Sequence, residues 1–372
     1  MKRTLFATLT SLLFFSNFSF TQATVSTIVD SSAYGFTDDL IFDDSGNLYC
    51  ADYSGDAIFK RTPGGSISEF ATGFNTPNGL AFDSFGNLFV CDNVGNAIYK
   101  LSDTGVFLDT FPISLPSGII KDAVSDTMIF TTYSSPGTLM KLAPNGTIVN
   151  FHSGSPLNGP VGLAYCQGEL YMSNFSNREI YRVEADTLIF IAQLPGSGSL
   201  GFIANVGGQL MATAFNGNKI YAINPITQDV FLYSGGSSGH VDGAVENALY
   251  TRPNGIVANP AGDTIYISEY SGKRLRMITG FTVSTDEVFK SVSFNLYPNP
   301  TTEVMNLTIE ASALPYSVTI HDVQGKTVYI EKDIMDTDLE LNLSEFETGT
   351  YTIMVESVNS GTSAKKMIKI PD

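Results

Sequence analysis

The sequence has no tryptophan, only three cysteines among its 372 residues, and few basic side chains. Its 20 Lys and Arg stand against 37 Asp and Glu, which gives a formal net charge of −17. Because phosphate-rich partners need a basic surface, this balance argues against nucleic acid and anionic lipid as partners. Cys50, Cys91 and Cys166 cannot all pair with one another, and no Cys-x-x-Cys spacing for a metal occurs. We therefore expect buried free thiols, and a disulfide between Cys50 and Cys91 is the less favoured alternative.

Long apolar stretches are also missing, except at the N-terminus. Lys2 and Arg3 precede an apolar run from Leu5 to Phe20, and Thr21–Ala23 offers a small residue for cleavage. This pattern predicts a secretory signal peptide over residues 1–23. The run is too short and too interrupted to span a bilayer as a stable helix, although an uncleaved anchor is the alternative. We expect no transmembrane segment after signal removal, and a secreted protein.

What the sequence does contain is a repeated unit. Its 34 Gly, 26 Phe and 17 Tyr suit many short strands joined by tight turns. An apolar strand, usually with a polar residue at its end, recurs as Leu48–Asp52, Leu88–Asp92, Met128–Thr132, Leu170–Asn174, Leu210–Ala214 and Ile265–Glu269. The step between copies is about 40 residues, with a longer step before the last copy. Several short strands in each period of this length are typical of a β-propeller.

The second copy shows the expected blade most clearly. Pro77–Gly79 forms a turn before an innermost strand at Leu80–Asp83. Leu88–Asp92, Ala97–Leu101 and Val106–Phe111 are expected to follow as the second, third and outermost strands. Gly and Asn in the loops between them favour tight hairpins. The pattern therefore predicts four antiparallel strands in each blade.

The sixth copy provides only three strands downstream of Pro253. Val25–Val29, at the other end of the expected mature chain, alternates as a strand should. We expect this strand to complete the sixth blade, which removes two open sheet edges at once. The prediction is an all-β fold, with a six-bladed β-propeller over residues 24–282.

Several of these segments resemble a known repeat. Ser238–Gly243, Ala248–Tyr250 and Arg252–Ile256, together with the Gly-Asn-Leu stretches that end at Asp52 and Asp92, resemble the NHL repeat. The resemblance implies a propeller of a family whose members are mostly binding platforms, with some enzymes among their relatives.

The pattern changes after residue 282. Residues 283–294 form a polar linker, and residues 295–372 contain short alternating strands that predict a small Ig-like β-sandwich. Tyr297–Pro300, Asp322–Lys326, Gly349–Tyr351 and the basic, apolar ending at Lys365–Ile370 resemble the type A C-terminal sorting domain of the Bacteroidota type IX (Por) secretion system. An ordinary β-sandwich module is the alternative.

The resemblance to sorting domains implies export through the periplasm and across the outer membrane. The partners that it implies for residues 295–372 are the type IX secretion machinery and its sortase-like peptidase. The product would be released or attached to the cell surface, and we expect it to be a monomer.

Two positions in each blade are expected at one mouth of the central channel, because the first and second strands run antiparallel. The first position, between Pro and Gly in the clearest copies, holds Asp38, Asn78, Ser117, Val161, Leu200 and Asn254. The second position, at the end of the second strand, holds Asp52, Asp92, Thr132, Asn174, Ala214 and Glu269.

These positions suggest two kinds of chemistry. Asp38, Asn78 and Asn254 supply oxygen ligands of the kind that Ca²⁺ or another divalent cation prefers. A ligand at the mouth would meet Asp52, Asp92, Asn174 and Glu269, and among these Asp92 or Glu269 is a candidate catalytic base. The structural alternative is that the Asp side chains bind backbone amides of the adjacent turns, and that Asn before Gly only forms a turn.

The arrangement is also similar to that of gluconolactonase-like six-bladed propellers, in which carboxylates and amides from several blades hold a divalent cation. Asp38 occupies a position where that family has an acidic ligand, but Val161 and Leu200 depart from the pattern. Two functions remain open. One is a binding module for an extracellular glycan, peptide or protein, and the other is a metal-dependent hydrolase or lactonase.

Overall fold

The computed structural model describes residues 23–30, 33–281, 294–322, 326–357 and 361–371. The predicted signal peptide and linker lie almost entirely outside these residues. The chain divides into two compact units on either side of residue 283. Strands dominate both units, and the described residues include one short 3₁₀ helix, η1 (Ala311–Ala313). No helix among the described residues is long and apolar enough to cross a membrane.

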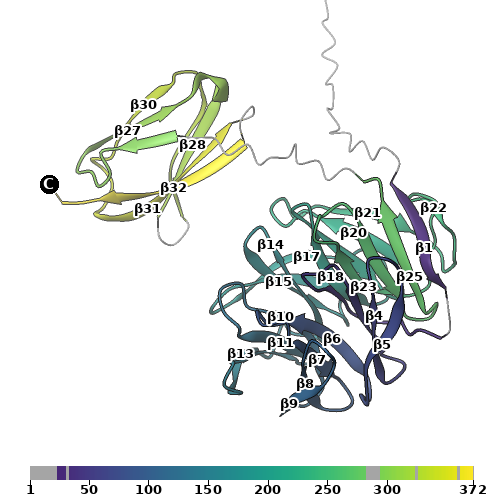
Figure 1. Cartoon of the computed structure of the whole chain (residues 1–372). Coiled ribbons are helices and arrows are strands. Elements are labelled where there is room, and N and C mark those ends of the chain that lie inside the picture. Colours follow the sequence, from purple (N-terminus) through teal and green to yellow (C-terminus); the bar gives the residue numbers. More distant parts are fainter. Residues whose placement is uncertain (1–22, 31–32, 282–293, 323–325, 358–360, 372) are drawn as a thin grey trace, which may run out of the picture. The chain divides into compact units, whose positions relative to one another are not determined.

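The first unit is a six-bladed β-propeller, as the repeat predicts, and its sheets are arranged around a central axis (Figure 1). Blade one comprises β2 (Leu40–Phe42), β3 (Leu48–Ala51), β4 (Ala57–Arg61) and β5 (Ile67–Thr72). Blade two comprises β6 (Pro77–Phe82), β7 (Leu88–Asp92), β8 (Ala97–Leu101) and β9 (Phe107–Pro112). Blade three comprises β10 (Pro116–Lys121), β11 (Met128–Thr132), β12 (Thr138–Leu142) and β13 (Ile148–Ser153). Blades four and five comprise β14 (Pro160–Cys166), β15 (Glu169–Asn174), β16 (Glu179–Val183) and β17 (Leu188–Gln193); and β18 (Leu200–Val206), β19 (Gln209–Ala214), β20 (Lys219–Ile223) and β21 (Val230–Gly235).

The sixth blade is closed by the N-terminal strand. Its sheet has the order β22 (Gly243–Ala244), β1 (Thr24–Asp30), β25 (Arg274–Thr279), β24 (Ile265–Glu269) and β23 (Pro253–Ala258). β1 pairs antiparallel with β25, so that Val25 lies opposite Ile278. This pairing confirms the expected closure, and it supplies the fourth strand that the sixth copy lacks.

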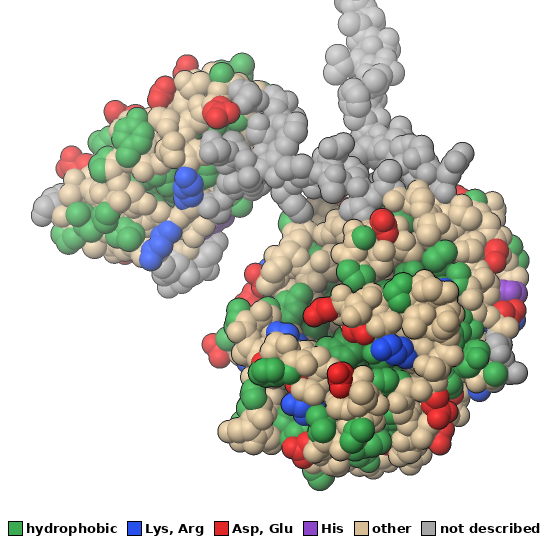
Figure 2. Space-filling model, viewed as in Figure 1, with side chains coloured by type: hydrophobic (Ala, Val, Ile, Leu, Met, Phe, Trp, Pro, Cys, Tyr) green, Lys and Arg blue, Asp and Glu red, His purple; other side chains and the backbone are tan. Residues whose placement is uncertain are grey.

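The core lies between the blades. The second strand of blade two, β7, is buried throughout, whereas the outermost strand, β9, is largely exposed. Tyr49 and Ala51 of blade one pack with Leu80 and Val90 of blade two, and equivalent clusters join the other blades. Cys50, Cys91 and Cys166 are buried free thiols, as expected. Acidic side chains are scattered over the visible propeller surface in Figure 2, and hydrophobic side chains gather near its centre.

The second unit is a small β-sandwich, as predicted. One sheet has the order β26 (Phe294–Tyr297), β27 (Val304–Ile309) and β30 (Asp338–Asn342), and the other has the order β29 (Thr327–Ile334), β28 (Tyr316–His321), β31 (Gly349–Ser357) and β32 (Gly361–Lys369). Met305 and Leu307 of the first sheet pack against Val318 and Ile353 of the second in one buried core.

Candidate ligand site in the propeller channel

The channel wall is built from the same bulge in five blades. Each of β6, β10, β14, β18 and β23 has one residue more than its partner strand between two paired positions. In β23, for example, two residues lie between the paired positions Pro253 and Ile256, opposite a single residue of the neighbouring strand. Such a bulge turns a side chain out of the strand plane. Hydroxyl groups then tie neighbouring blades together: Thr213 donates to the carbonyl of Asn254 at 2.6 Å, and Ser268 donates to that of Asp38 at 2.7 Å.

The pairing register in blade five corrects one sequence assignment. Leu200 pairs with Ala214 as Pro253 pairs with Glu269, so Leu200 takes the place of the proline. The channel position in blade five is therefore Gly201, and the prediction that Leu200 occupies it is wrong. Leu200 is fully buried between the blades. The same pairing places Phe202 at the position that glycine occupies in most blades.

Five aromatic side chains surround one mouth of the channel, and we call them the aromatic collar. Each directly follows the end position of the second strand of its blade, and the set is Tyr53, Tyr133, Phe175, Phe215 and Tyr270. Ring centroids are 6.1 Å apart for Tyr53–Tyr270, 5.4 Å for Tyr270–Phe215, 5.5 Å for Phe215–Phe175 and 5.8 Å for Phe175–Tyr133. Blade two has Asn93 at this position, where it donates to the carbonyl of Pro116.

The sequence analysis missed the collar, although its signal is visible in the repeat. The residue after each strand-ending position is aromatic in five of the six copies.

Below the collar, a polar floor closes a cavity of about 230 Å³. Asp38, Asn78, Ser117 and Asn254 line it, together with Val161. The Oδ1 atom of Asn78 and the Oγ atom of Ser117 are buried without a hydrogen-bond partner. Unpaired buried polar atoms are costly, so both are suited to pair with a bound molecule.

Asp38 is the carboxylate of this floor. It is 2% exposed and accepts a hydrogen bond from Nδ2 of Asn254 at 3.0 Å. Burial raises the pKa of Asp38 well above its usual value, and the nearby carboxylates of Asp39 and Asp52 raise it further. The floor therefore favours a protonated Asp38 or a ligand that supplies positive charge or hydrogen-bond donors.

The strand-ending side chains are placed differently from this floor. Asp92 accepts hydrogen bonds from the backbone amides of Asn75, Thr76 and Gly95. Asn174 likewise accepts from the amide of Asn158 at 3.0 Å. Neither side chain lines the cavity, and each ties the loop before the first strand to the end of the second strand.

Asp52 and Glu269 also lie outside the cavity lining. Asp52 accepts hydrogen bonds from the hydroxyls of Thr37 at 3.1 Å and Ser54 at 2.9 Å. Asp92 thus accepts backbone amides, which was the structural alternative for the two aspartates, whereas Asp52 accepts hydroxyl groups.

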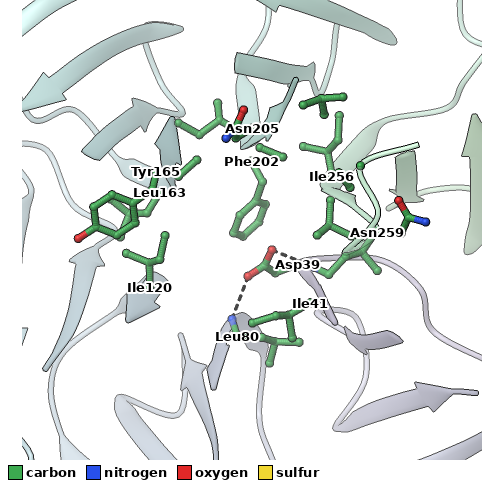
Figure 3. A pocket seen from close by; sticks show the side chains of 18 of the residues that line it. Asp39, Ile41, Leu80, Ile120, Leu163, Tyr165, Phe202, Asn205, Ile256 and Asn259 are labelled. Atoms are coloured by element: carbon green, nitrogen blue, oxygen red, sulfur yellow. Dashed lines mark hydrogen bonds between the residues drawn. The ribbon is translucent and has the colours of Figure 1, made fainter. Parts of the chain in front are cut away.

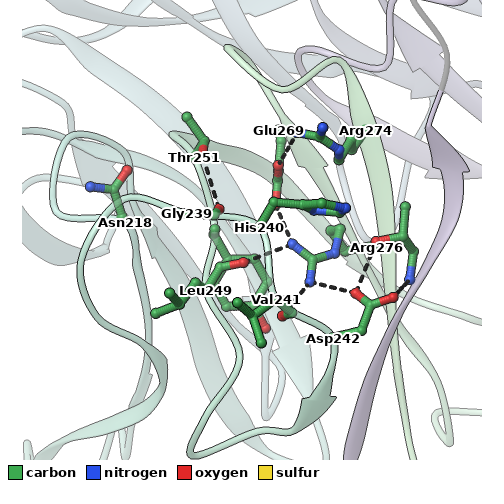
Figure 4. Close-up of polar contacts among 12 residues, drawn as sticks. Asn218, Gly239, His240, Val241, Asp242, Leu249, Thr251, Glu269, Arg274 and Arg276 are labelled. Atoms are coloured by element: carbon green, nitrogen blue, oxygen red, sulfur yellow. Dashed lines mark hydrogen bonds and ion pairs between the residues drawn. The ribbon is translucent and has the colours of Figure 1, made fainter.

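Glu269 belongs to a buried ion-pair network (Figure 4). Its Oε1 accepts a hydrogen bond at 2.5 Å from Arg276, whose guanidinium also donates to the carbonyls of Val241 and Leu249 and to Oδ1 of Asp242. Asp242 in turn accepts from the amide and hydroxyl of Thr27 in β1. Burial raises the pKa of Glu269, while Arg276 opposes that rise. The network joins β24, β25 and the closing strand.

The donor set gives a cation only a partial shell. Asp38, Asn78 and Asn254 do line one cavity, and the unpaired Oδ1 of Asn78 is a suitable oxygen ligand. Among the described residues, however, no group of three or more His, Cys, Asp or Glu side chains is placed to hold a metal ion. Ca²⁺ takes six to eight oxygen ligands, so water or substrate would have to complete the shell.

The opposite mouth of the channel has another character (Figure 3). Its cavity is larger, about 510 Å³, and most of its lining side chains are apolar. Asp39 and Phe202 face each other at its centre, and Phe202 also borders the collar cavity.

Comparisons with known proteins agree with this description. Residues 295–370 match the family model described as a secretion system C-terminal sorting domain. A search among curated proteins finds no match.

Solved propellers resemble the first unit in fold. An auxiliary nutrient binding protein from Bacteroides thetaiotaomicron is 13% identical, with 69% of this chain and 76% of that chain covered and a TM-score of 0.60. A gluconolactonase from Xanthomonas campestris is 16% identical, with 69% and 89% covered and a TM-score of 0.55. A virginiamycin B lyase from Staphylococcus aureus is 19% identical, with 66% and 80% covered and a TM-score of 0.50.

At these identities the likeness concerns the fold alone. The chain thus joins a six-bladed β-propeller to a segment, residues 295–370, that belongs to the family of secretion system C-terminal sorting domains.

Proposed function

We propose that this protein is an exported binding module whose propeller holds a carbohydrate unit inside the aromatic collar. The observation that carries the proposal is the combination of five aromatic rings with unpaired buried polar atoms in one cavity. Aromatic rings offer apolar faces to the C–H surface of a sugar ring. Ligand hydroxyls would donate to Oδ1 of Asn78 and pair with the Ser117 hydroxyl.

Export would follow from the sorting domain. Its family membership supports passage through the periplasm on a type IX pathway, with the secretion machinery and a sortase-like peptidase as partners of residues 295–372. The propeller would then act in the extracellular medium or on the outer-membrane surface as a monomeric NHL-type module. A preference for a glycan over a peptide or protein rests on the collar and its polar floor.

A metal-dependent, gluconolactonase-like hydrolase is the second candidate. The presence of Asp38, Asn78 and Asn254 in one cavity favours it. Of the two candidate bases, Asp92 is held by three backbone amides and Glu269 by Arg276. Neither side chain is among the residues that line this cavity, so the binding function is preferred.

A glycan-binding assay tests the preferred function. We would screen the purified full chain against a glycan array and measure its best hits by calorimetry. Phe215→Ala and Tyr270→Ala should each weaken binding at least tenfold, which is the effect of losing about 1.4 kcal/mol of contact. Phe85→Ala is the matched control, because Phe85 is 80% exposed on a hairpin loop. Equal binding by collar and control variants would overturn the proposal.

Calcium titration tests the second candidate. Tight Ca²⁺ binding that disappears in Asp38→Ala, together with turnover of lactones, would establish the hydrolase. Absence of binding at millimolar calcium would remove it and leave the carbohydrate proposal unaffected.

A further inference from the structure

The mouth opposite the collar contains an isolated carboxylate in an apolar funnel. Ile41, Ile120 and Leu163 are among the side chains that line the funnel, which encloses about 510 Å³. Asp39 lies at its centre and is 9% exposed. A carboxylate in such surroundings is unfavourable unless a partner compensates its charge.

The two central side chains are departures from the repeat. Gly79, Gly118 and Gly255 occupy the equivalent position in other blades, and a Cβ there would lie 2.2, 1.6 and 2.2 Å from a backbone oxygen of the next blade. Blade one has Asp39 and blade five has Phe202 instead. The other blades leave no room for a side chain at this position. Asp39 and Phe202 therefore give the funnel its only carboxylate and its only phenyl ring.

The hydrogen bonds of Asp39 leave its charge without a cation. Its Oδ1 accepts from the amide of Leu40, and its Oδ2 accepts from the amide of Leu80, each at 2.9 Å. None of the ion pairs among the described residues involves Asp39. Each oxygen keeps acceptor capacity toward the funnel, because a carboxylate oxygen can accept more than one hydrogen bond.

We propose that this funnel is a second binding site, which takes a small apolar amine with its ammonium group on Asp39. The ammonium would lie between the carboxylate and the face of Phe202, where both charge pairing and a cation–π contact favour it. The hydrocarbon part would cover Ile41, Ile120 and Leu163, at a gain of about 25 cal/mol for each Å² buried. An anion would be repelled, since Asp39 already occupies the two nearby amides.

This proposal does not depend on the collar. Phe202 borders both cavities, and every other lining residue belongs to one cavity alone. Loss of sugar binding in collar variants should therefore leave amine binding unchanged, and the two proposals can fail separately.

Hexylamine and hexanol are a matched pair of probes for the funnel. Calorimetry with the full chain at mildly alkaline pH should show amine binding about tenfold to a hundredfold tighter than alcohol binding. Asp39→Asn should abolish this preference while keeping alcohol binding. Asp103→Asn, in the exposed turn between β8 and β9, is the control and should keep the preference. Equal affinity for both probes, or a preference that persists in Asp39→Asn, would overturn the proposal.

A second variant keeps the test decisive if Asp39→Asn fails to fold. Ala258 is partly exposed in the lining of the funnel. Ala258→Phe should fill the mouth and weaken both probes, whereas Tyr270→Ala should weaken neither. Undiminished hexylamine binding by Ala258→Phe would place the amine elsewhere and refute the assignment.

Discussion

Replacing Arg276 with methionine tests how the propeller ring is held closed. Arg276 is fully buried and donates to Glu269 at 2.5 Å and to Asp242 at 2.8 Å. Its removal leaves the Glu269 carboxylate, which is 0% exposed, without its main partner. Breaking a buried pair on one side costs about 3–5 kcal/mol. The second contact of Glu269, to Arg274 at 3.8 Å, should keep the loss near the lower end of that range.

The assay is urea unfolding followed by tyrosine-dominated near-UV circular dichroism, because the chain has no tryptophan. Arg276→Met should lose about 3 kcal/mol of unfolding free energy at neutral pH. Adding Glu269→Gln to Arg276→Met should restore part of this, because it removes the orphaned charge. Arg182→Met is the control, since Arg182 and Glu184 form a partly exposed pair, with side chains 35% and 40% exposed, and exposed pairs contribute under about 1 kcal/mol.

Two results would contradict this reasoning. One is a loss in Arg276→Met no larger than that in Arg182→Met. The other is a double variant that is no more stable than Arg276→Met, which would show that the stranded Glu269 charge is not the source of the cost.

Three further predictions follow from the channel. Burial raises the pKa of Asp39 to about 7, so the native state holds this proton more tightly than the unfolded chain, and the stability that the bound proton provides is lost as pH rises from about 4 through 7. In urea titrations at a series of pH values, the unfolding free energy of the wild type should fall by up to about 4 kcal/mol more than that of Asp39→Asn over this range. The same pH dependence in both proteins would exclude this effect of Asp39. Phe202→Ala should cost about 3–5 kcal/mol and join the two cavities, so that calorimetric competition between a sugar and hexylamine appears only in that variant. Asp92→Ala should cost at least about 1–3 kcal/mol by thermal unfolding, because it strands backbone amides near the mouth, and an unchanged midpoint would argue against this role.

Much of the fold could be predicted because its signals are local and repeated. An apolar strand followed by a turn marks each blade, and the alternation of Val25–Val29 is enough to assign it to the incomplete sixth blade. The sorting domain was recognised from short landmarks spread along the tail. These signals needed no knowledge of how distant side chains meet.

The site was harder to predict, since it depends on register and orientation. Leu200 pairs with Ala214 and so takes the place that proline has in β23, which leaves Gly201 at the channel position, and sequence spacing alone does not reveal this register. The same limit applies to Asp92, whose carboxylate turns back to the amides of Asn75 and Thr76. The aromatic residues of the collar can be found in the sequence, because each follows a strand end. Their common role becomes evident only when the structure places them next to one another around the channel axis.

The pairing of β1 with β25 sets the order in which this protein can fold. Thr24 and Thr279 are partners in one sheet, although nearly the whole propeller separates them along the chain. A ring of this topology cannot close until its last blade has been synthesised, and the entropy of joining such distant segments makes closure a late event. Until then the growing chain keeps an unpaired blade edge and lacks its final packing.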